Sequence, residues 1–209
     1  MLHAPVQIAV FVSGGGTNLQ ALIDAEREEK IPHGHIALVL SNNPDAYALQ
    51  RAERAGIESV VVCRKDFEHG CDFEAALVAH LRRRGIGLIV LAGFMSILSA
   101  AFTAEYADRI INIHPSLIPS FCGKGYYGLH VHEAALACGV KVTGATVHYV
   151  NEIPDGGKII LQKAVRVLPH DTPESLQKRV MRLAEWKLLP EAAELVCRRL
   201  SVTERNDHE

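Results

Sequence analysis

The chain has 209 residues, of which 48% are apolar and 22% are charged, and its formal net charge is −2. This balance is typical of a soluble globular protein, and because it implies no basic surface it argues against nucleic acid as the main partner. No apolar run approaches the roughly 20 residues that span a bilayer, and five widely spaced cysteines indicate neither a disulfide framework nor a zinc site. We therefore expect one cytoplasmic domain over residues 1–209, without a metal or a membrane contact.

Short runs rich in Val, Ile and Leu alternate with amphipathic segments through the first half of the chain. The expected strands are 6–12, 35–40, 57–62, 86–92 and 109–113, and the expected helices are 18–27, 46–55, 72–84 and 100–107. Repeated strand–helix–strand order predicts a mostly parallel, Rossmann-like sheet with helices on both faces.

A glycine-rich turn, Ser-Gly-Gly-Gly-Thr-Asn at residues 13–18, joins the first strand to the first helix. Glycines allow close approach of a ligand, and the free N–H groups at a helix start attract anions, so the turn suits a sugar phosphate. Tight strand-to-helix turns also need glycine for purely structural reasons. A dinucleotide site is disfavoured, because Leu19 stands where its third glycine would be.

The run Ile-Ile-Asn-Ile-His-Pro at residues 110–115 carries two polar groups in an apolar strand that a proline ends. Residues two apart in a strand point the same way, so Asn112 and His114 share one face. At the carboxyl end of a parallel strand they would face a ligand cleft. The alternative, a core histidine bonded to a backbone carbonyl with Asn112 capping the turn, is about equally favoured.

The pattern changes in the second half of the chain. A short helix at 131–138 precedes two strand-like segments, 141–150 and 158–167, with only a turn between them. Such a short connection predicts an antiparallel C-terminal strand pair, and hence a mixed sheet. A last helix should begin near Thr172, capped by Asp171 or Thr172, and Pro190 should kink or divide it.

Asn112 and His114 suit the transfer of an acyl-type group. An amide and a protonated imidazole can stabilise the oxyanion of a tetrahedral intermediate, and the imidazole can relay a proton. A carboxylate would support the charged ring, and Asp155 in the Pro-Asp-Gly-Gly turn is the candidate. Asp-Gly is also ordinary turn chemistry, and sequence spacing alone does not bring Asp155 to His114.

Several motifs occur together along the chain: SGGGTNLQ at 13–20, SNN at 41–43, LAGFM at 91–95, NIHPSLIP at 112–119, GLH at 128–130, TVHYV at 146–150, DGG at 155–157 and ILQ at 160–162. On these residues the chain resembles the phosphoribosylglycinamide formyltransferases, folate-dependent enzymes of purine biosynthesis. The resemblance covers about residues 6–195. It implies the formyltransferase fold, with a phosphate-binding half at about 1–105 and a catalytic and folate half at about 106–200.

The resemblance also implies an activity and its residues. A formyl group would pass from 10-formyltetrahydrofolate, the co-substrate, directly to the primary amine of 5'-phosphoribosylglycinamide, in a monomer or homodimer. The implied catalytic residues are Asn112, His114 and Asp155. The implied substrate-binding residues are Gly16, Thr17, Asn18 and Glu185. The implied folate-binding residues are Met95, Ser96, Ile97, Leu98, Asn112, Asn151, Glu152, Ile153, Pro154 and Asp155.

The chain departs from the family pattern at a few places. Ser96 and Gly70 stand where many relatives carry arginine, although Arg64 or Lys65 can substitute for the second, and Trp186 replaces a histidine. The 120–127 loop is longer than usual, and a surface loop is favoured over a lid. The alternatives are a non-catalytic folate- or nucleotide-binding homologue and a methionyl-tRNA formyltransferase, whose basic tRNA-facing surface the net charge disfavours.

Overall fold

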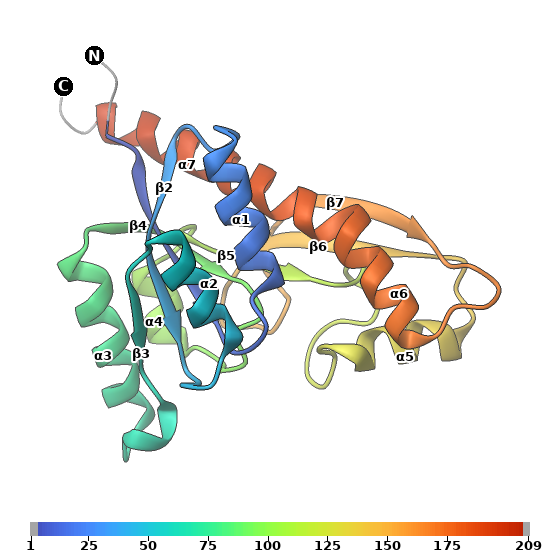
Figure 1. Cartoon of the computed structure of the whole chain (residues 1–209). Helices are drawn as coiled ribbons and strands as arrows, with labels where there is room; N and C mark the ends of the chain where they lie inside the picture. Colours follow the sequence, from blue (N-terminus) through green and yellow to red (C-terminus); the bar gives the residue numbers. More distant parts are fainter. Residues whose placement is uncertain (1–3, 207–209) are drawn as a thin grey trace.

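A seven-stranded mixed sheet runs through the middle of the molecule (Figure 1). The computed structural model describes residues 4–206. The strands are β1 (Val6–Val12), β2 (Gly34–Ser41), β3 (Ser59–Val61), β4 (Ile86–Leu91), β5 (Ile110–His114), β6 (Val142–Tyr149) and β7 (Ile159–Arg166). Their order is β3-β2-β1-β4-β5-β6-β7; β1 to β5 are parallel, while β5–β6 and β6–β7 pair antiparallel. The predicted mixed sheet is therefore confirmed.

Helices cover both faces of this sheet. They are α1 (Thr17–Arg27), α2 (Tyr47–Ala55), α3 (Gly70–Arg83), α4 (Ala100–Glu105), α5 (Leu129–Cys138), α6 (Pro173–Val180) and α7 (Trp186–Asn206), with a 3-10 turn η1 (Arg64–Asp66) and a π-helical turn η2 (Met181–Glu185). One apolar core lies between the sheet and α1, α2, α6 and α7, and a second lies under α3 and α4.

The two cores explain why the first strand is apolar from Ile8 to Val12. Ile8, Val10 and Val12 pack into the core under α1 and α7, whereas Ala9 and Phe11 pack into the core under α3. Successive side chains of a strand point to opposite faces, so a strand covered on both sides has no polar position. The continuous apolar run is thus the sequence mark of a central parallel strand.

A capping box decides where the C-terminal helix begins. Thr172 is the N-cap, and its side chain and that of Ser175 bond reciprocally to each other's backbone N–H groups, with Pro173 in the first turn. This confirms the predicted start. Asp171 does not cap the helix; its carboxylate instead pairs with Arg179.

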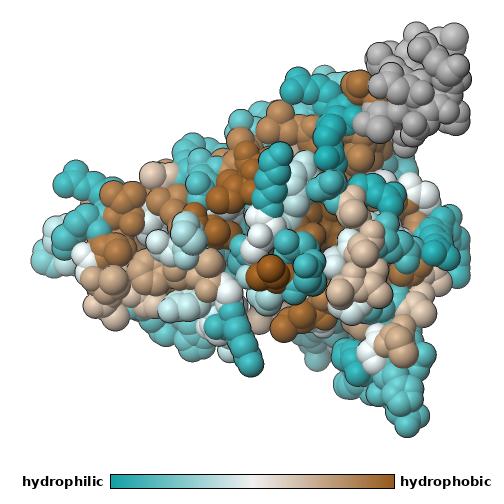
Figure 2. Space-filling view, turned by 180° about the vertical axis from the view of Figure 1, so that it is seen from behind, coloured by the Kyte–Doolittle hydropathy of each residue, from teal (hydrophilic) through white to brown (hydrophobic). Residues whose placement is uncertain are grey.

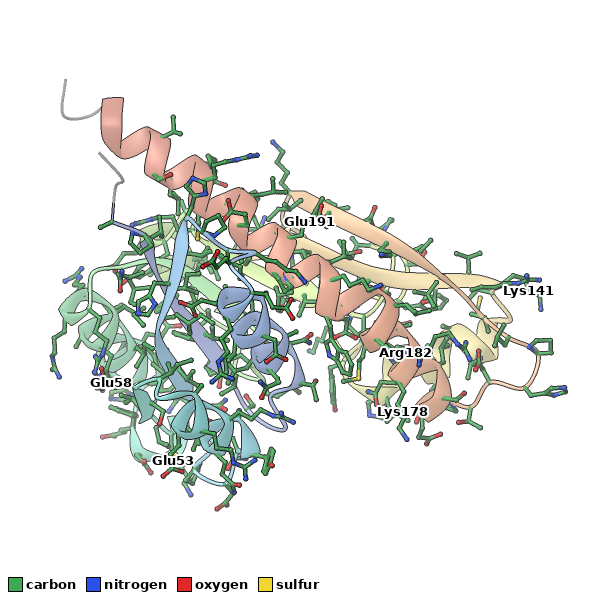
Figure 3. The ribbon with its side chains drawn as sticks, turned by 45° about the horizontal axis from the view of Figure 1, so that its top comes forward. Glu53, Glu58, Lys141, Lys178, Arg182 and Glu191 are labelled. Carbon is green, nitrogen blue, oxygen red and sulfur yellow. The ribbon has the colours of Figure 1, made fainter. Side chains whose placement is uncertain are left out.

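Pro190 does not divide the helix, contrary to expectation. It lies inside α7, and the departure from regular geometry is the π-helical turn Met181–Glu185 just before α7. Proline cannot bond the carbonyl four residues earlier, that of Trp186, so α7 continues with one backbone hydrogen bond fewer. Lys178, Arg182 and Glu191 consequently lie along one continuous helical rod (Figure 3).

The order of the strands places the loops that follow β1 and β5 at the same end of the sheet. The order along the sheet reverses between β1 and β4, and the loops after β1 and β5 flank that point at the carboxyl ends of parallel strands. Open α/β sheets bind ligands at such a switch point. Within residues 4–206, no helix combines the length and apolarity that a membrane crossing requires.

Candidate active site

Side chains from two distant parts of the chain meet at β5. Asn112 and His114 lie on one face of the strand, opposite Ile111 and Ile113, which pack into the core under α1 and α7. Asp155 reaches them from the connection between β6 and β7, and its Oδ2 is 3.5 Å from Nδ1 of His114. His114 is buried, whereas Asn112 and Asp155 are partly exposed. The arrangement places a histidine–carboxylate pair behind an amide that a ligand can reach.

His148 joins this group from β6, where it is paired with Asn112. Its Nδ1 lies 2.8 Å from the carbonyl oxygen of Tyr149, and because a carbonyl only accepts, Nδ1 carries the proton. In the neutral ring, Nε2 then accepts a hydrogen bond from Nδ2 of Asn112 at 3.2 Å. This bond orients the Asn112 amide and leaves its second N–H hydrogen for a ligand.

The charges of the pair are set by opposing effects. Burial holds the pKa of His114 below its ordinary value, while the charge of Asp155 and the Phe121 carbonyl oppose that shift. Burial also acts to raise the pKa of the Asp155 carboxyl, but the nearby His148 ring, the hydrogen bond from the Gly123 N–H and the His114 ring outweigh it, and this pKa lies below its usual range. Asp155 is therefore ionised at neutral pH and attracts a proton to His114.

The segment that follows β5 closes over the pair. The carbonyl oxygen of Phe121 accepts a hydrogen bond from Nε2 of His114 at 2.8 Å, and the N–H of Gly123 donates to Oδ2 of Asp155 at 2.8 Å. Residues 124–128 are exposed, as expected of a surface loop. Residues 121–123 instead belong to the site, which sequence reasoning missed because their contacts come from the backbone.

The glycine loop packs tightly against α2. Gly16 has a φ of 70°, and a Cβ added there would lie 2.6 Å from Cβ of Ala48. The N–H of Ala48 donates to the Gly14 carbonyl at 3.0 Å, and Nε of Arg51 donates to the Gly15 carbonyl at 2.8 Å. Gly16 provides no side-chain cap, so the first turn of α1 presents its backbone N–H groups to an anion.

Asn18 and Glu185 meet at the start of α1. Nδ2 of Asn18 donates to Oε2 of Glu185 at 2.8 Å. Burial raises the pKa of Glu185 to about 7, although the bond from Asn18 acts to lower it. Oδ1 of Asn18 is buried without a hydrogen-bond partner among the described residues, and half-buried Thr17 adjoins it. A buried unpaired acceptor next to a carboxyl that can hold a proton suits a polar ligand.

The two segments expected to bind folate both border the core under α3 and α4. Leu98 belongs to that core and Val150 packs against it. Apolar side chains remain exposed on both segments, namely Met95, Ile97 and Ile153. On the face seen in Figure 2, apolar residues form patches between hydrophilic ones. Exposed apolar groups beside polar ones are suited to a flat heteroaromatic ring.

The polar residues of these segments hold the backbone in place. Ser13 Oγ accepts from the N–H of Met95 at 2.8 Å, and Nδ2 of Asn42 donates to Oγ of Ser96 at 2.8 Å. Asn151 Oδ1 accepts from the N–H two residues later at 3.0 Å, which shapes a turn whose Glu152 and Pro154 are exposed. Of the described side chains, no group of three or more His, Cys, Asp or Glu is placed to hold a metal ion.

The sequence matches the formyl transferase family over residues 6–193, which is most of the chain. The chain belongs to the formyl transferase family. It is 44% identical over 184 residues to the phosphoribosylglycinamide formyltransferase of Haemophilus influenzae, a match that covers 88% of this chain and 84% of that protein. It is also 46% identical over 181 residues to the trifunctional purine biosynthetic protein adenosine-3 of Drosophila melanogaster. That match covers 86% of this chain but only 13% of the trifunctional protein.

Solved structures agree with this assignment. The crystal structure of glycinamide ribonucleotide transformylase 1 from Symbiobacterium toebii superimposes with a TM-score of 0.86 at 42% identity. The superposition covers 93% of this formyl transferase and 88% of that chain. The family and the fold that the motifs predicted are thereby confirmed.

Proposed function

We propose that this formyl transferase moves a formyl group from 10-formyltetrahydrofolate to the primary amine of 5'-phosphoribosylglycinamide, with Asn112, His114 and Asp155 as its catalytic residues. The observation that carries the proposal is their convergence: an imidazole and a carboxylate 3.5 Å apart lie beside an amide that has one N–H hydrogen unpaired among the described residues. Acyl-type transfer needs this combination, because its tetrahedral intermediate develops a negative oxygen.

Each catalytic group has one task in this proposal. The amine nitrogen bonds to the formyl carbon, and the bond from that carbon to the folate nitrogen then breaks. Asn112 donates a hydrogen bond to the oxyanion. Both ring nitrogens of His114 face acceptors, so protonated His114 supplies a nearby positive charge, which Asp155 stabilises. The proton that the leaving nitrogen requires comes from this pair through water, and the proton that the attacking amine loses returns to the pair in the same way.

The acceptor substrate occupies the region around the start of α1. Gly16, Thr17 and Asn18 bind its phosphate through the first turn of the helix, where aligned N–H groups favour an anion. Glu185 meets the glycinamide end, and its pKa of about 7 lets it accept or donate a hydrogen bond there. The unpaired Oδ1 of Asn18 supports a polar substrate at this point.

The folate lies between residues 95–98 and residues 151–155, with Asn112 at the inner end. Met95, Ile97 and Ile153 contribute apolar contact to the pterin, and the backbone near Ser96 and Asp155 contributes polar groups. Arg64 stands in for the arginine that many relatives carry at position 70, because its guanidinium nitrogens lie 3.8 and 4.0 Å from where a Cβ on Gly70 would be. An exposed guanidinium there suits an anionic folate tail.

The direct test is a formyl-transfer assay with both substrates, comparing the wild type with His114→Ala. We expect turnover in the wild type and a loss of at least about 100-fold in kcat in the variant, since general acid–base groups contribute roughly that much. Calorimetry should show that the variant still binds phosphoribosylglycinamide. A wild type that binds both substrates but transfers nothing would instead favour a non-catalytic homologue.

A further inference from the structure

The backbone of residues 121–123 contacts both members of the His114–Asp155 pair. A carbonyl oxygen can only accept, so the bond to Phe121 keeps a proton on Nε2 of His114, and the N–H of Gly123 favours the ionised form of Asp155. Both residues have positive φ, 50° at Phe121 and 86° at Gly123. For Phe121 that conformation costs about 1–2 kcal/mol, so the surrounding structure has to hold it.

A hydrogen-bond network holds the preceding residues of the same segment. Oγ of Ser116 donates to the Ser120 carbonyl at 2.5 Å, and Oγ1 of Thr146 donates to the Ser116 carbonyl at 2.7 Å. Thr146 Oγ1 also accepts from the N–H of Ile118 at 3.1 Å. Gln162 connects Ile118 and Thr146, because its Nε2 donates to the Ile118 carbonyl and to Thr146 Oγ1, each at 3.0 Å.

The sheet register connects this network to the site. His114 on β5 is paired with Thr146 on β6, and Thr146 is paired with Gln162 on β7, so three polar residues form one row across three neighbouring strands (Figure 1). The Thr146 hydroxyl has one acceptor and two donors, which saturates it and fixes its direction. Neither Thr146 nor Gln162 bonds to Asn112, His114 or Asp155.

We propose that Thr146 and Gln162 are positioning residues for formyl transfer: they fix residues 116–120, and thereby hold the Phe121 carbonyl and the Gly123 N–H on the His114–Asp155 pair. The proposal rests on the catalytic roles proposed above. Groups that orient a catalytic pair act on turnover more than on substrate affinity, because the substrate does not touch them.

The chain offers a matched control for this role. Thr143 is also buried in β6, but its Oγ1 has no hydrogen-bond partner among the described residues. Thr146→Val and Thr143→Val therefore remove the same atoms from the same strand, and only the first breaks the network. Gln162 is exposed, so Gln162→Met removes the bridging donor with little risk to folding.

The test measures kcat, KM and the nitrogen-15 signals of labelled histidine, with the His114 signals assigned by their absence from His114→Ala. We expect Thr146→Val and Gln162→Met to lower kcat by about 10- to 100-fold while KM for phosphoribosylglycinamide changes less than about 2-fold. The neutral His114 ring should shift from the Nε2–H tautomer toward a mixture. Thr143→Val should match the wild type, and Thr146→Ser should restore most of the loss.

Two results would overturn the proposal. One is a kcat in Gln162→Met and Thr146→Val equal to that of Thr143→Val. The other is a His114 tautomer in Thr146→Val and Gln162→Met that equals that of the wild type, together with a lower melting temperature. A purely structural role of the two residues would produce that result. Should the wild type itself fail to transfer formyl, the catalytic proposal fails, yet the tautomer measurement still decides whether the network orients His114.

Discussion

At the scale of single residues, burial determines which groups hold protons. His132, in α5, is fully buried and neither ring nitrogen has a hydrogen-bond partner among the described residues. Burial lowers its pKa to about 4, with a further contribution from His114. The folded protein therefore keeps His132 neutral where an unfolded chain, with an ordinary pKa near 6.5, would protonate it.

This difference predicts a pH-dependent stability. As pH falls from about 6.5 to about 4, the unfolded state gains a proton at His132 that the folded state does not, so stability is lost over that window, by up to about 3 kcal/mol. In His132→Leu this part of the dependence should vanish. Urea unfolding between pH 4 and 7 measures it, with exposed His170→Leu as the control. Parallel pH profiles for the wild type and His132→Leu would contradict the prediction.

At the scale of elements, the glycine loop depends on the close approach of α2. Gly16→Ala places a Cβ 2.6 Å from Cβ of Ala48 in a residue with a φ of 70°, which should cost roughly 2 kcal/mol and weaken phosphoribosylglycinamide binding. Gly15→Ala is the control, because its Cβ would meet nothing within 4 Å. Denaturant unfolding compares them. Equal urea midpoints for the two variants would show that the loop has room to relax.

The elements also show how far sequence alone could reach. Strand and helix positions followed from apolar periodicity, and the antiparallel pair followed from the short connection after β6. The shared face of Asn112 and His114 followed from the two-residue period of a strand. The same period, applied to Thr146 and His148, could have revealed the polar row on β6. The contact of residues 121–123 with His114 and Asp155 could not be predicted, because every residue except proline has the same backbone donor and acceptor.

Pro190 shows a different limit of sequence reasoning. A proline predicts that one hydrogen bond is missing, but packing decides where the helix absorbs the change. Here α7 remains continuous through Pro190, and the irregular π-helical turn lies before α7, at Met181–Glu185. Glu185, the last residue of that turn, meets Asn18 from α1. The sequence predicted an irregularity at Pro190, whereas the irregular turn of this helix lies at Met181–Glu185.

At the scale of the whole molecule, the fold divides the chemistry between its halves. The parallel half presents a helix start to an anion, and the antiparallel strands bring His148, Asp155 and the polar row to β5. The motifs identified the family. They did not show that His114 would be buried under the segment that follows its own strand.

The central claim is that His114 and Asp155 act as one catalytic unit, and a double-mutant cycle on kcat tests it most directly. The four proteins are the wild type, His114→Ala, Asp155→Asn and the double variant, each assayed at saturating formyl folate and phosphoribosylglycinamide. We predict that each single variant loses about 100-fold or more, and that the double variant falls no further than the worse single one, because groups that act as a unit are non-additive. A double variant whose loss equals the product of the two single losses, or an Asp155→Asn with the turnover of the wild type, would contradict the account.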